Sequence, residues 1–154
     1  LYSTHDTTGS DRSMQNMLST VHQDEEKKVS DVLSSISDIK SLQLLRAISL
    51  LNADSDILMS ELNLTPKGFY TRMNRLLKVG VIERRIARYY LTSFGKIVLH
   101  AQHTIDSALL SYWKLRALDS FVTTNGLPIE EFNKLTETLI ENKELRSIIR
   151  QHKV

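Results

Sequence analysis

Hydrophobic residues recur with helical spacing along most of this chain. Near the N-terminal end the apolar positions follow i, i+3, i+4, i+7, which predicts an amphipathic helix within 24–36; these positions are Val29, Val32, Leu33 and Ile36. The same periodicity predicts a second helix that ends near Leu51, with Ser37 or Asp38 as its N-cap. The segment 1–23 is polar, and we expect a flexible tail there.

Two helices separated by a tight break follow. A helix of about two turns is expected over 56–62. The next is expected over 65–79: Thr65 is a good N-cap, and Pro66 fits the first helical position, where its missing N–H has no consequence. Gly80 is well placed to close this helix in the left-handed conformation.

β-Branched and aromatic residues over 81–86 and 88–91 predict a small hairpin. Thr92 or Ser93 then caps a long helix that is expected to reach Phe121. A loop at 123–128 and two further helices, over 129–141 and 144–151, complete the chain.

This order of elements is that of a winged helix-turn-helix. We therefore predict a mainly α fold, in which a winged helix-turn-helix domain with a short β-hairpin wing is followed by a long helix and C-terminal helices. The expected organisation is a tail at 1–23, a DNA-binding domain at 24–92, and a dimerisation helix with a helical extension at 93–154.

Positive charge is concentrated in one block of the sequence. Residues 65–96 contain eight Lys and Arg residues against one Glu, a net charge of +7, although the whole chain carries only +2. The segment before this block is acidic, and the segment after it is neutral. Such a block is typical of a surface that binds a polyanion, although a solvated charged face has the same composition.

The helix at 65–79 is expected to bury one face and offer the other to DNA. Phe69, Met73, Leu76 and Gly80 follow i, i+4, i+7, i+11 and predict the buried seam. The opposite face carries groups that bond phosphates or base edges in the major groove. The candidate DNA-binding residues here are Thr65, Lys67, Gly68, Tyr70, Thr71, Asn74, Arg75 and Lys78, with Gly68 included because it would let the backbone approach the duplex closely.

The predicted wing, 81–91, has arginines near its tip. Arg85 and Arg88 are the preferred contacts to the flanking backbone or minor groove. Strand alternation prevents every arginine from facing DNA, and Arg84 or Arg85 could instead pair with Glu83 or cover apolar surface.

Several of these motifs resemble archaeal winged helix-turn-helix transcriptional regulators. The run from Leu62 to Arg84, with Gly80-Val81-Ile82 after the helix, is similar to that family, and Tyr89–Lys96 resembles its tyrosine-leucine-threonine-x-x-glycine-lysine entry into the next helix. Tyr112–Asp119 and Asn125–Pro128 are similar to uncharacterised archaeal relatives. The likeness covers about 36–150 and implies a DNA-binding regulator. One departure is the wing tip, Ile86-Ala87-Arg88, which has no glycine.

The helix expected over 93–121 has two apolar faces. One is a seam that steps by 4, 3, 4, 3, 4, 3, as in coiled coils; it comprises Phe94, Val98, Ala101, Ile105, Ala108, Tyr112 and Leu115. A second face comprises Leu109, Leu110, Trp113, Ala117 and Phe121. Because two faces need two partners, we expect the C-terminal helices on one side and a second subunit on the other, although a purely intrachain core is the alternative.

Other chemistry has little support in the sequence. There is no cysteine, no glycine-rich phosphate loop and no nucleophile–base pair, so we expect no enzyme activity and no cofactor. His100, His103 and Asp106 have a zinc-compatible spacing, but three residues of one helix rarely suffice, and we expect no metal site. No apolar stretch could cross a bilayer and the first residues lack a signal-peptide layout, so a cytoplasmic protein is expected.

The sequence therefore predicts a homodimeric transcriptional regulator that binds double-stranded DNA sequence-specifically. The helix 65–79 would enter the major groove, and the wing 81–91 would contact the flanking backbone. The alternative is a winged-helix module that uses the same face to bind an acidic protein within a larger complex.

Overall fold

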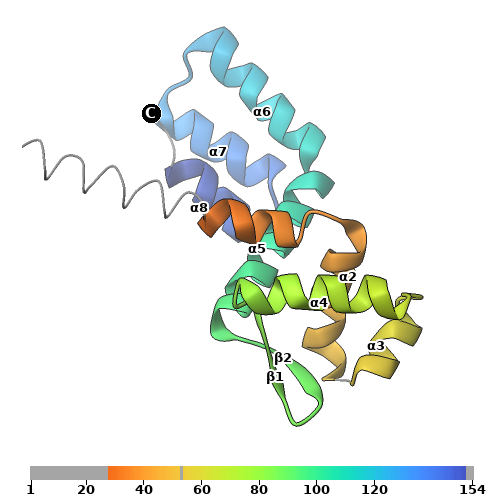
Figure 1. Ribbon diagram of the computed structural model, residues 1–154. Coiled ribbons are helices and arrows are strands. Elements are labelled where there is room, and N and C mark those ends of the chain that lie inside the picture. The colour runs from red at the N-terminus through yellow and green to blue at the C-terminus, as the bar shows by residue number, and fades with distance from the viewer. Residues whose placement is uncertain (1–27, 53, 152–154) are drawn as a thin grey trace, which may run out of the picture. The chain divides into compact units, whose positions relative to one another are not determined.

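The computed structural model describes residues 28–52 and 54–151 (Figure 1). The predicted tail at 1–23 and the start of the first expected helix lie outside the described residues. Contacts divide the chain into two compact units that meet between Gly95 and Lys96, and each unit is presented by itself.

The described part of the first unit begins with three helices, two of them capped by an aspartate. Residues 28–35 are helical, and α2 (Ile39–Leu51) and α3 (Ser55–Glu61) follow. Asp38 caps α2 by accepting a hydrogen bond from the Ser41 N–H, and Asp54 caps α3 by accepting one from the Ile57 N–H at 3.1 Å. The helix expected to end near Leu51 and the helix expected over 56–62 are confirmed, and their ends agree with the prediction within a residue or two.

The helix α4 (Pro66–Lys78) ends where the sequence indicated. The Thr65 hydroxyl accepts from the Gly68 N–H at 3.2 Å, so the predicted N-cap is confirmed. At the other end the Gly80 N–H donates to the Leu77 carbonyl, and Gly80 has a φ of 77°. A side chain is strained at that φ, which is why glycine suits the position that closes the helix.

A two-stranded antiparallel hairpin follows α4 and confirms the predicted wing. The strands are β1 (Ile82–Arg85) and β2 (Arg88–Leu91), with Ile82 opposite Leu91 and Arg85 opposite Arg88. One further bridge joins Asp54, just before α3, to Arg88 at the start of β2. The order of elements therefore confirms the predicted mainly α fold with a winged helix-turn-helix.

The core of this unit lies among α2, α3, α4 and the hairpin. The fully or almost fully buried apolar side chains are Leu44, Leu45, Ile48, Leu58, Phe69, Met73, Leu76, Val81, Ile82 and Tyr89. Phe69 contacts Tyr89 edge to face, with ring centroids 6.1 Å apart. The predicted apolar seam of α4 is confirmed, because Phe69, Met73 and Leu76 are its three buried residues.

Hydrogen bonds join the residues that follow α4 to the start of α5 (Ser93–Leu110). The Thr92 hydroxyl donates to the Gly80 carbonyl at 2.6 Å and accepts from the Gly95 N–H at 2.9 Å, while the Thr92 N–H donates to the Val81 carbonyl at 3.1 Å. A Cβ on Gly95 would lie 1.8 Å from the Val81 carbonyl oxygen. The two backbones approach so closely that only glycine fits at this position.

The helix that follows the wing is shorter than expected. It was predicted to reach Phe121, but α5 ends at Leu110 and α6 (Tyr112–Asn125) begins after Ser111. Ser111 has φ −98° and ψ 11°, outside the helical region, and its N–H is shared between the carbonyls of Ser107 and Ala108. Sharing of this kind is common where a helix tightens and ends.

The second unit comprises α5 beyond Gly95, α6, α7 (Ile129–Leu139) and α8 (Lys143–Gln151). Helix α6 runs on through Asn125, so the predicted loop at 123–128 is shorter than expected; Gly126 ends the helix with a φ of 52°. The Asn142 side chain accepts from the N–H groups of Glu144 and Leu145 and caps α8.

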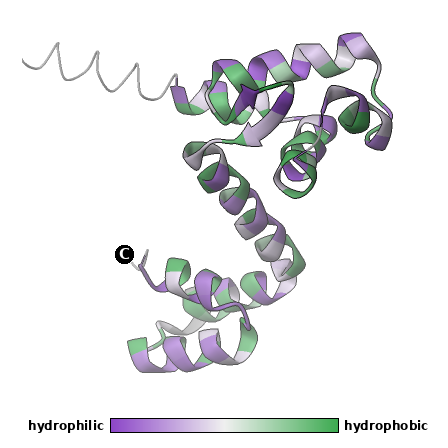
Figure 2. Ribbon diagram, turned by 90° about the horizontal axis from the view of Figure 1, so that it is seen from below, coloured by the Kyte–Doolittle hydropathy of each residue, from purple (hydrophilic) through white to green (hydrophobic). Residues whose placement is uncertain are grey.

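The buried core of the second unit is small. Its buried apolar side chains are Val98, Leu118, Phe132, Ile140 and Leu145. In contrast, ten large apolar side chains are exposed among the described residues of this unit: Ile97, Ile105, Leu109, Leu110, Tyr112, Trp113, Phe121, Val122, Ile129 and Ile148. Hydrophobic positions recur along α5, as the green bands of Figure 2 show. The described part of this unit therefore leaves more large apolar side chains at its surface than it buries.

None of the helices within 28–52 and 54–151 is both long and apolar enough to cross a membrane.

Replacement of Gly95 by alanine tests the close contact between α5 and the segment after α4. The added methyl group would overlap the Val81 carbonyl, so one backbone must move, and we expect Gly95→Ala to lower the free energy of unfolding by about 2 kcal/mol or more. Urea denaturation followed by circular dichroism measures the loss. The control is Ser93→Ala, an exposed neighbour, for which we expect a change within about 0.5 kcal/mol. Equal stabilities of Gly95→Ala and the wild type would contradict the contact.

Candidate nucleic-acid interface

Helix α4 separates its polar and apolar residues onto opposite faces. Opposite the buried seam lie seven of the residues that the sequence selected, and all of them are exposed: Thr65, Lys67, Tyr70, Thr71, Asn74, Arg75 and Lys78. The structure therefore brings this part of the predicted site together on one continuous face, which we call the α4 face. It offers hydroxyl, amide, guanidinium and ammonium groups, which are the groups that bond base edges and phosphates.

The α4 face is positively charged and carries no carboxylate. The sequence has no acidic residue between Glu61 and Glu83. Within the part of the chain that the structure describes, Lys67, Arg75 and Lys78 form no ion pair, so these three cations remain available to an external anion. Arg75 and Lys78 also lie in the last turn of α4, where the helix dipole favours positive charge.

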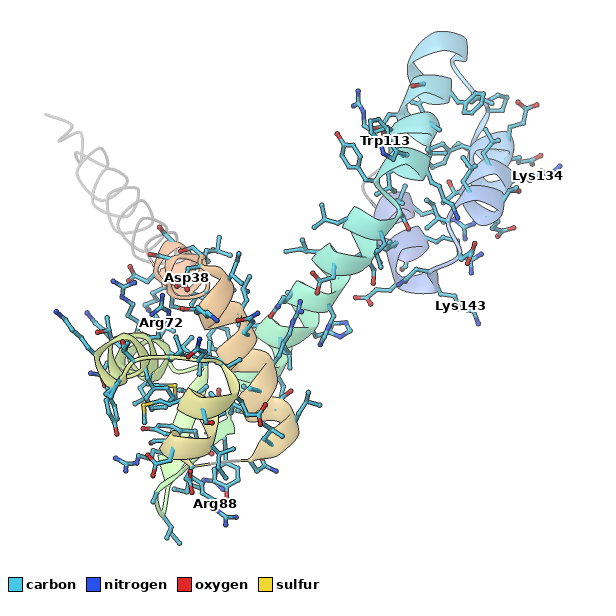
Figure 3. All side chains as sticks on the ribbon, turned by 90° about the vertical axis from the view of Figure 1, so that its right-hand side faces the viewer. Asp38, Arg72, Arg88, Trp113, Lys134 and Lys143 are labelled. Carbon is cyan, nitrogen blue, oxygen red and sulfur yellow. The ribbon has the colours of Figure 1, made fainter. Side chains whose placement is uncertain are left out.

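Arg72 belongs to the same basic block but has a different role. Its Nε donates to the Asp38 carboxylate at 3.0 Å, and its Nη1 donates to the Gly68 carbonyl at 3.0 Å. Figure 3 shows Asp38 and Arg72 facing one another from α2 and α4. Because Asp38 also caps α2, one carboxylate joins the first turn of α2 to the middle of α4 and fixes the angle at which the α4 face is presented.

The environment of Asp38 favours its charged form. Burial raises the pKa of this carboxyl, but hydrogen bonds from the side chain of Ser41, at 2.6 Å, and from Arg72 outweigh that effect and hold the pKa below its ordinary value. A depressed pKa means that the carboxylate contributes stability above the unfolded-state value, about 3.9, and loses it as the pH falls through the folded-state value.

Gly68 has an explanation within the chain. A Cβ at this position would lie 3.1 Å from the Thr65 hydroxyl oxygen and 3.3 Å from Nη1 of Arg72. The missing side chain therefore leaves room for the helix cap and for the Arg72 guanidinium. Close approach of DNA to this backbone stays a prediction.

The arginines of the wing have unequal surroundings. Arg85 forms an ion pair with Glu83 on the same strand, which is the alternative that the sequence left open. Arg84 lies over the Tyr89 ring, 5.7 Å from the centroid, in a cation–π contact. Arg88 is exposed at the start of β2, where Figure 3 shows it by the hairpin tip. Of the two wing contacts proposed from sequence, Arg88 is the one without an ion pair among the described residues.

Sequence reasoning missed the residues that position the site. Asp38 was identified only as one of two possible caps, and its partner Arg72 lies 34 positions away. Thr92 was one of two possible caps of the helix α5, and the structure shows that Thr92 is the cap, but its bond to the Gly80 carbonyl could not be foreseen. A Thr-x-x-Gly signature after a hairpin is the one local signal that could have indicated this contact.

One histidine of α5, His100, takes part in an intrachain contact. His100 Nε2 lies 2.8 Å from the Glu144 carboxylate of α8, and the Thr104 hydroxyl donates to the same oxygen at 2.9 Å. The hydrogen bond from Thr104, and to a smaller extent the one with His100, lowers the pKa of Glu144. Within the described ranges, no group of three or more histidine, aspartate or glutamate side chains is arranged to hold a metal ion.

A helix-turn-helix followed by a hairpin, with a basic polar face on its second helix, defines the winged helix-turn-helix class of domain. Among solved structures, the multiple antibiotic-resistance repressor (MarR) from Listeria monocytogenes is similar to this chain, with a TM-score of 0.46 and 12% identity over 95% of this chain and 99% of that one. No protein-family model matches the sequence. None of the curated proteins is similar to it in sequence. The resemblance to archaeal regulators stays a prediction.

Replacement of Asp38 by alanine tests the junction between α2 and α4. The variant loses a helix cap and the partner of Arg72, and we expect the free energy of unfolding at neutral pH to fall by about 1–2 kcal/mol. The difference from the wild type should begin to shrink as the pH falls below the unfolded-state pKa of about 3.9, because the unfolded wild-type chain then binds a proton that the folded carboxylate does not, and it should go on shrinking down through the lower folded-state pKa. Urea denaturation at several pH values measures both effects.

Asp31→Ala is the matched control, because Asp31 is exposed and caps neither α2 nor α3. It should change stability by no more than about 0.5 kcal/mol. If Asp38→Ala behaves like this control, or if its deficit is constant from pH 7 to pH 3, the proposed junction is wrong.

Proposed function

We propose that this protein is a transcriptional regulator that binds double-stranded DNA sequence-specifically. In this proposal α4 lies in the major groove and the basic wing contacts the flanking backbone. The observation that carries the proposal is the α4 face: seven exposed residues on one side of a helix, with hydrogen-bonding and cationic groups and no carboxylate. Fold alone does not define a function, so the chemistry of this face is the main support.

The groups on the α4 face divide into two roles. Lys67, Arg75 and Lys78 supply positive charge, which neutralises phosphates and provides most of the affinity. Asn74 can make paired hydrogen bonds to adenine, and Thr71 can contact a base or the backbone, so these two are the candidates for direct base recognition. Tyr70 is about half exposed and packs edge to face on Phe69, so one part of its ring is supported by the core while the rest is open to a ligand.

The second part of the proposal is that the regulator is a homodimer formed through α5 and α6. Three residues of the seam predicted along these helices, Phe94, Ile105 and Tyr112, are 46%, 60% and 48% exposed. Packing within the chain therefore leaves much of the seam open to a partner. On the second face Leu110 is 90% exposed and Trp113 is 79% exposed. Large apolar side chains gathered in this way are typical of a protein interface.

A second copy of the same chain suits these faces because regulators of this class read DNA as twofold dimers. A symmetric pair would present two α4 helices to a pseudo-palindromic site, with half-sites about 34 Å apart along the duplex. The break at Ser111 divides the apolar surface of each subunit between two helices, α5 and α6, rather than one uninterrupted helix.

Charge reversal on the α4 face tests the DNA-binding proposal. The double variant Lys67→Glu, Arg75→Glu replaces two cations with carboxylates, and we expect affinity for duplex DNA to fall by about a hundredfold or more. In the wild type the affinity should fall steeply with salt, and single variants Lys67→Ala and Arg75→Ala should each reduce the slope of log K against log[salt] by about one. Gel shift and fluorescence anisotropy with random genomic duplexes measure these quantities.

Lys134→Glu, Lys143→Glu is the control, because it makes the same change in net charge on exposed lysines of α7 and α8. It should bind DNA nearly as the wild type does. Equal losses in the two double variants would mean that only net charge matters and that the α4 face is wrongly assigned. If the wild type retards no duplex, the alternative of a module for an acidic protein partner is favoured.

Charge introduced at Leu110 and Trp113 tests the homodimer. The variant Leu110→Glu, Trp113→Glu buries two carboxylates if the proposed interface forms, and we expect it to be monomeric at concentrations at which the wild type has twice the mass of one chain. Light scattering after size-exclusion chromatography measures the mass. Leu50→Glu is the matched control, because Leu50 is 80% exposed on α2 and should leave the dimer intact. A monomeric wild type, or a variant that stays dimeric, would contradict the proposed interface.

A further inference from the structure

The tip of the wing has an unusual backbone for its residues. Ile86 and Ala87 connect β1 to β2, with φ values of 43° and 64°, and Arg85 faces Arg88 as the last pair before the turn. Two-residue hairpin turns with both φ values positive normally use Asn-Gly or a similar pair, because side chains there clash with the backbone. A β-branched residue is the least suited of all to this conformation.

No contact among the described residues accounts for an isoleucine here. Ile86 is 99% exposed, so its side chain packs against nothing in the part of the chain that the structure describes. An exposed isoleucine alone is ordinary on a protein surface. An exposed isoleucine that also strains its own backbone is different, because asparagine or glycine would relieve the strain without any loss of packing. Strain of this kind is characteristic of functional sites, where the side chain itself is needed.

The residues around Ile86 indicate what it would contact. Arg85 and Arg88 flank it on the two strands, and Arg84 lies one residue further back. The backbone bridge between Arg88 and Asp54 holds the tip end of β2 against the start of α3. The wing tip is therefore an exposed apolar side chain beside Arg88, which forms no ion pair among the described residues, and the bridge to Asp54 fixes the tip on the helix-turn-helix. A DNA minor groove has phosphates along its rims and sugar C–H groups on its walls, and apolar side chains can insert there between the faces of stacked bases.

We propose that Ile86 is a minor-groove wedge: its side chain enters the groove beside the half-site bound by α4 and partly separates two stacked base pairs, while Arg88 contacts a flanking phosphate. Flexible pyrimidine–purine steps separate most easily, so the wedge adds a preference for such steps at positions that no polar group reads. This inference rests on the proposed DNA-binding function and adds a specificity-determining residue to it.

The test uses a duplex rich in TA steps in which 2-aminopurine, a base whose fluorescence rises when it is unstacked, replaces adenine. We expect wild-type protein to raise the fluorescence on binding. The variant Ile86→Asn should bind at least about fivefold more weakly and should not raise the fluorescence, since its side chain cannot form the apolar contact. The same variant should melt a few degrees higher than the wild type, about 2–4 °C, because asparagine tolerates the left-handed conformation.

Two further variants separate the effect of the Ile86 side chain from the effect of the strained backbone of the turn. Ala87→Gly relieves strain in the same turn but keeps Ile86, and it should melt higher, bind as tightly as the wild type and keep the fluorescence change. Ile86→Leu keeps an apolar side chain and should retain the fluorescence change. If Ile86→Asn binds and unstacks the duplex like the wild type, the wedge is wrong although the proposed function stands. If the wild type binds no duplex, both are wrong.

Discussion

The contact between the start of α5 and the segment that leaves α4 is the constraint on which the arrangement of the first unit depends. Thr92 bonds to the carbonyls of Gly80 and Val81, and Gly95 lies so close to Val81 that a side chain would not fit. The strands β1 and β2 leave from this junction and return to it, so their position is set by the same bonds. Without the contact, α4 would keep its hydrophobic seam but lose the element that fixes the hairpin beside it.

A second contact, between Asp38 at the start of α2 and Arg72, orients α4. Asp38 caps α2 and binds Arg72, and Arg72 in turn bonds to the Gly68 carbonyl. One arginine of the basic block is thereby used to orient α4, while the cations on the α4 face stay unpaired within the described residues. The basic residues of α4 thus have two functions: Arg72 orients the helix, and Lys67, Arg75 and Lys78 form the exposed site. The sequence alone does not distinguish these two roles, but the geometry does.

Much of the fold followed from the sequence because local signals are strong here. Thr65-Pro66 and Gly80 mark the ends of α4, and the spacing of Phe69, Met73 and Leu76 identifies its buried face. The break at Ser111 did not follow, because the apolar periodicity continues across it and the Leu115 N–H still donates to the Ser111 carbonyl. The sequence left open whether Arg84 or Arg85 pairs with Glu83, and it did not indicate the pair of Arg72 with Asp38, since a charge pattern does not say which of several partners is within reach.

The central claim is that the polar side of α4, together with the tip of the wing, is the surface that meets duplex DNA. Amide chemical shifts of isotope-labelled protein titrated with a random-sequence duplex test it most directly. The account predicts that the largest changes fall on residues 65–78 and 85–88, and that they diminish as salt is raised, while α7 and α8 change little. Changes concentrated on α7 and α8, or no change at low salt, would contradict it.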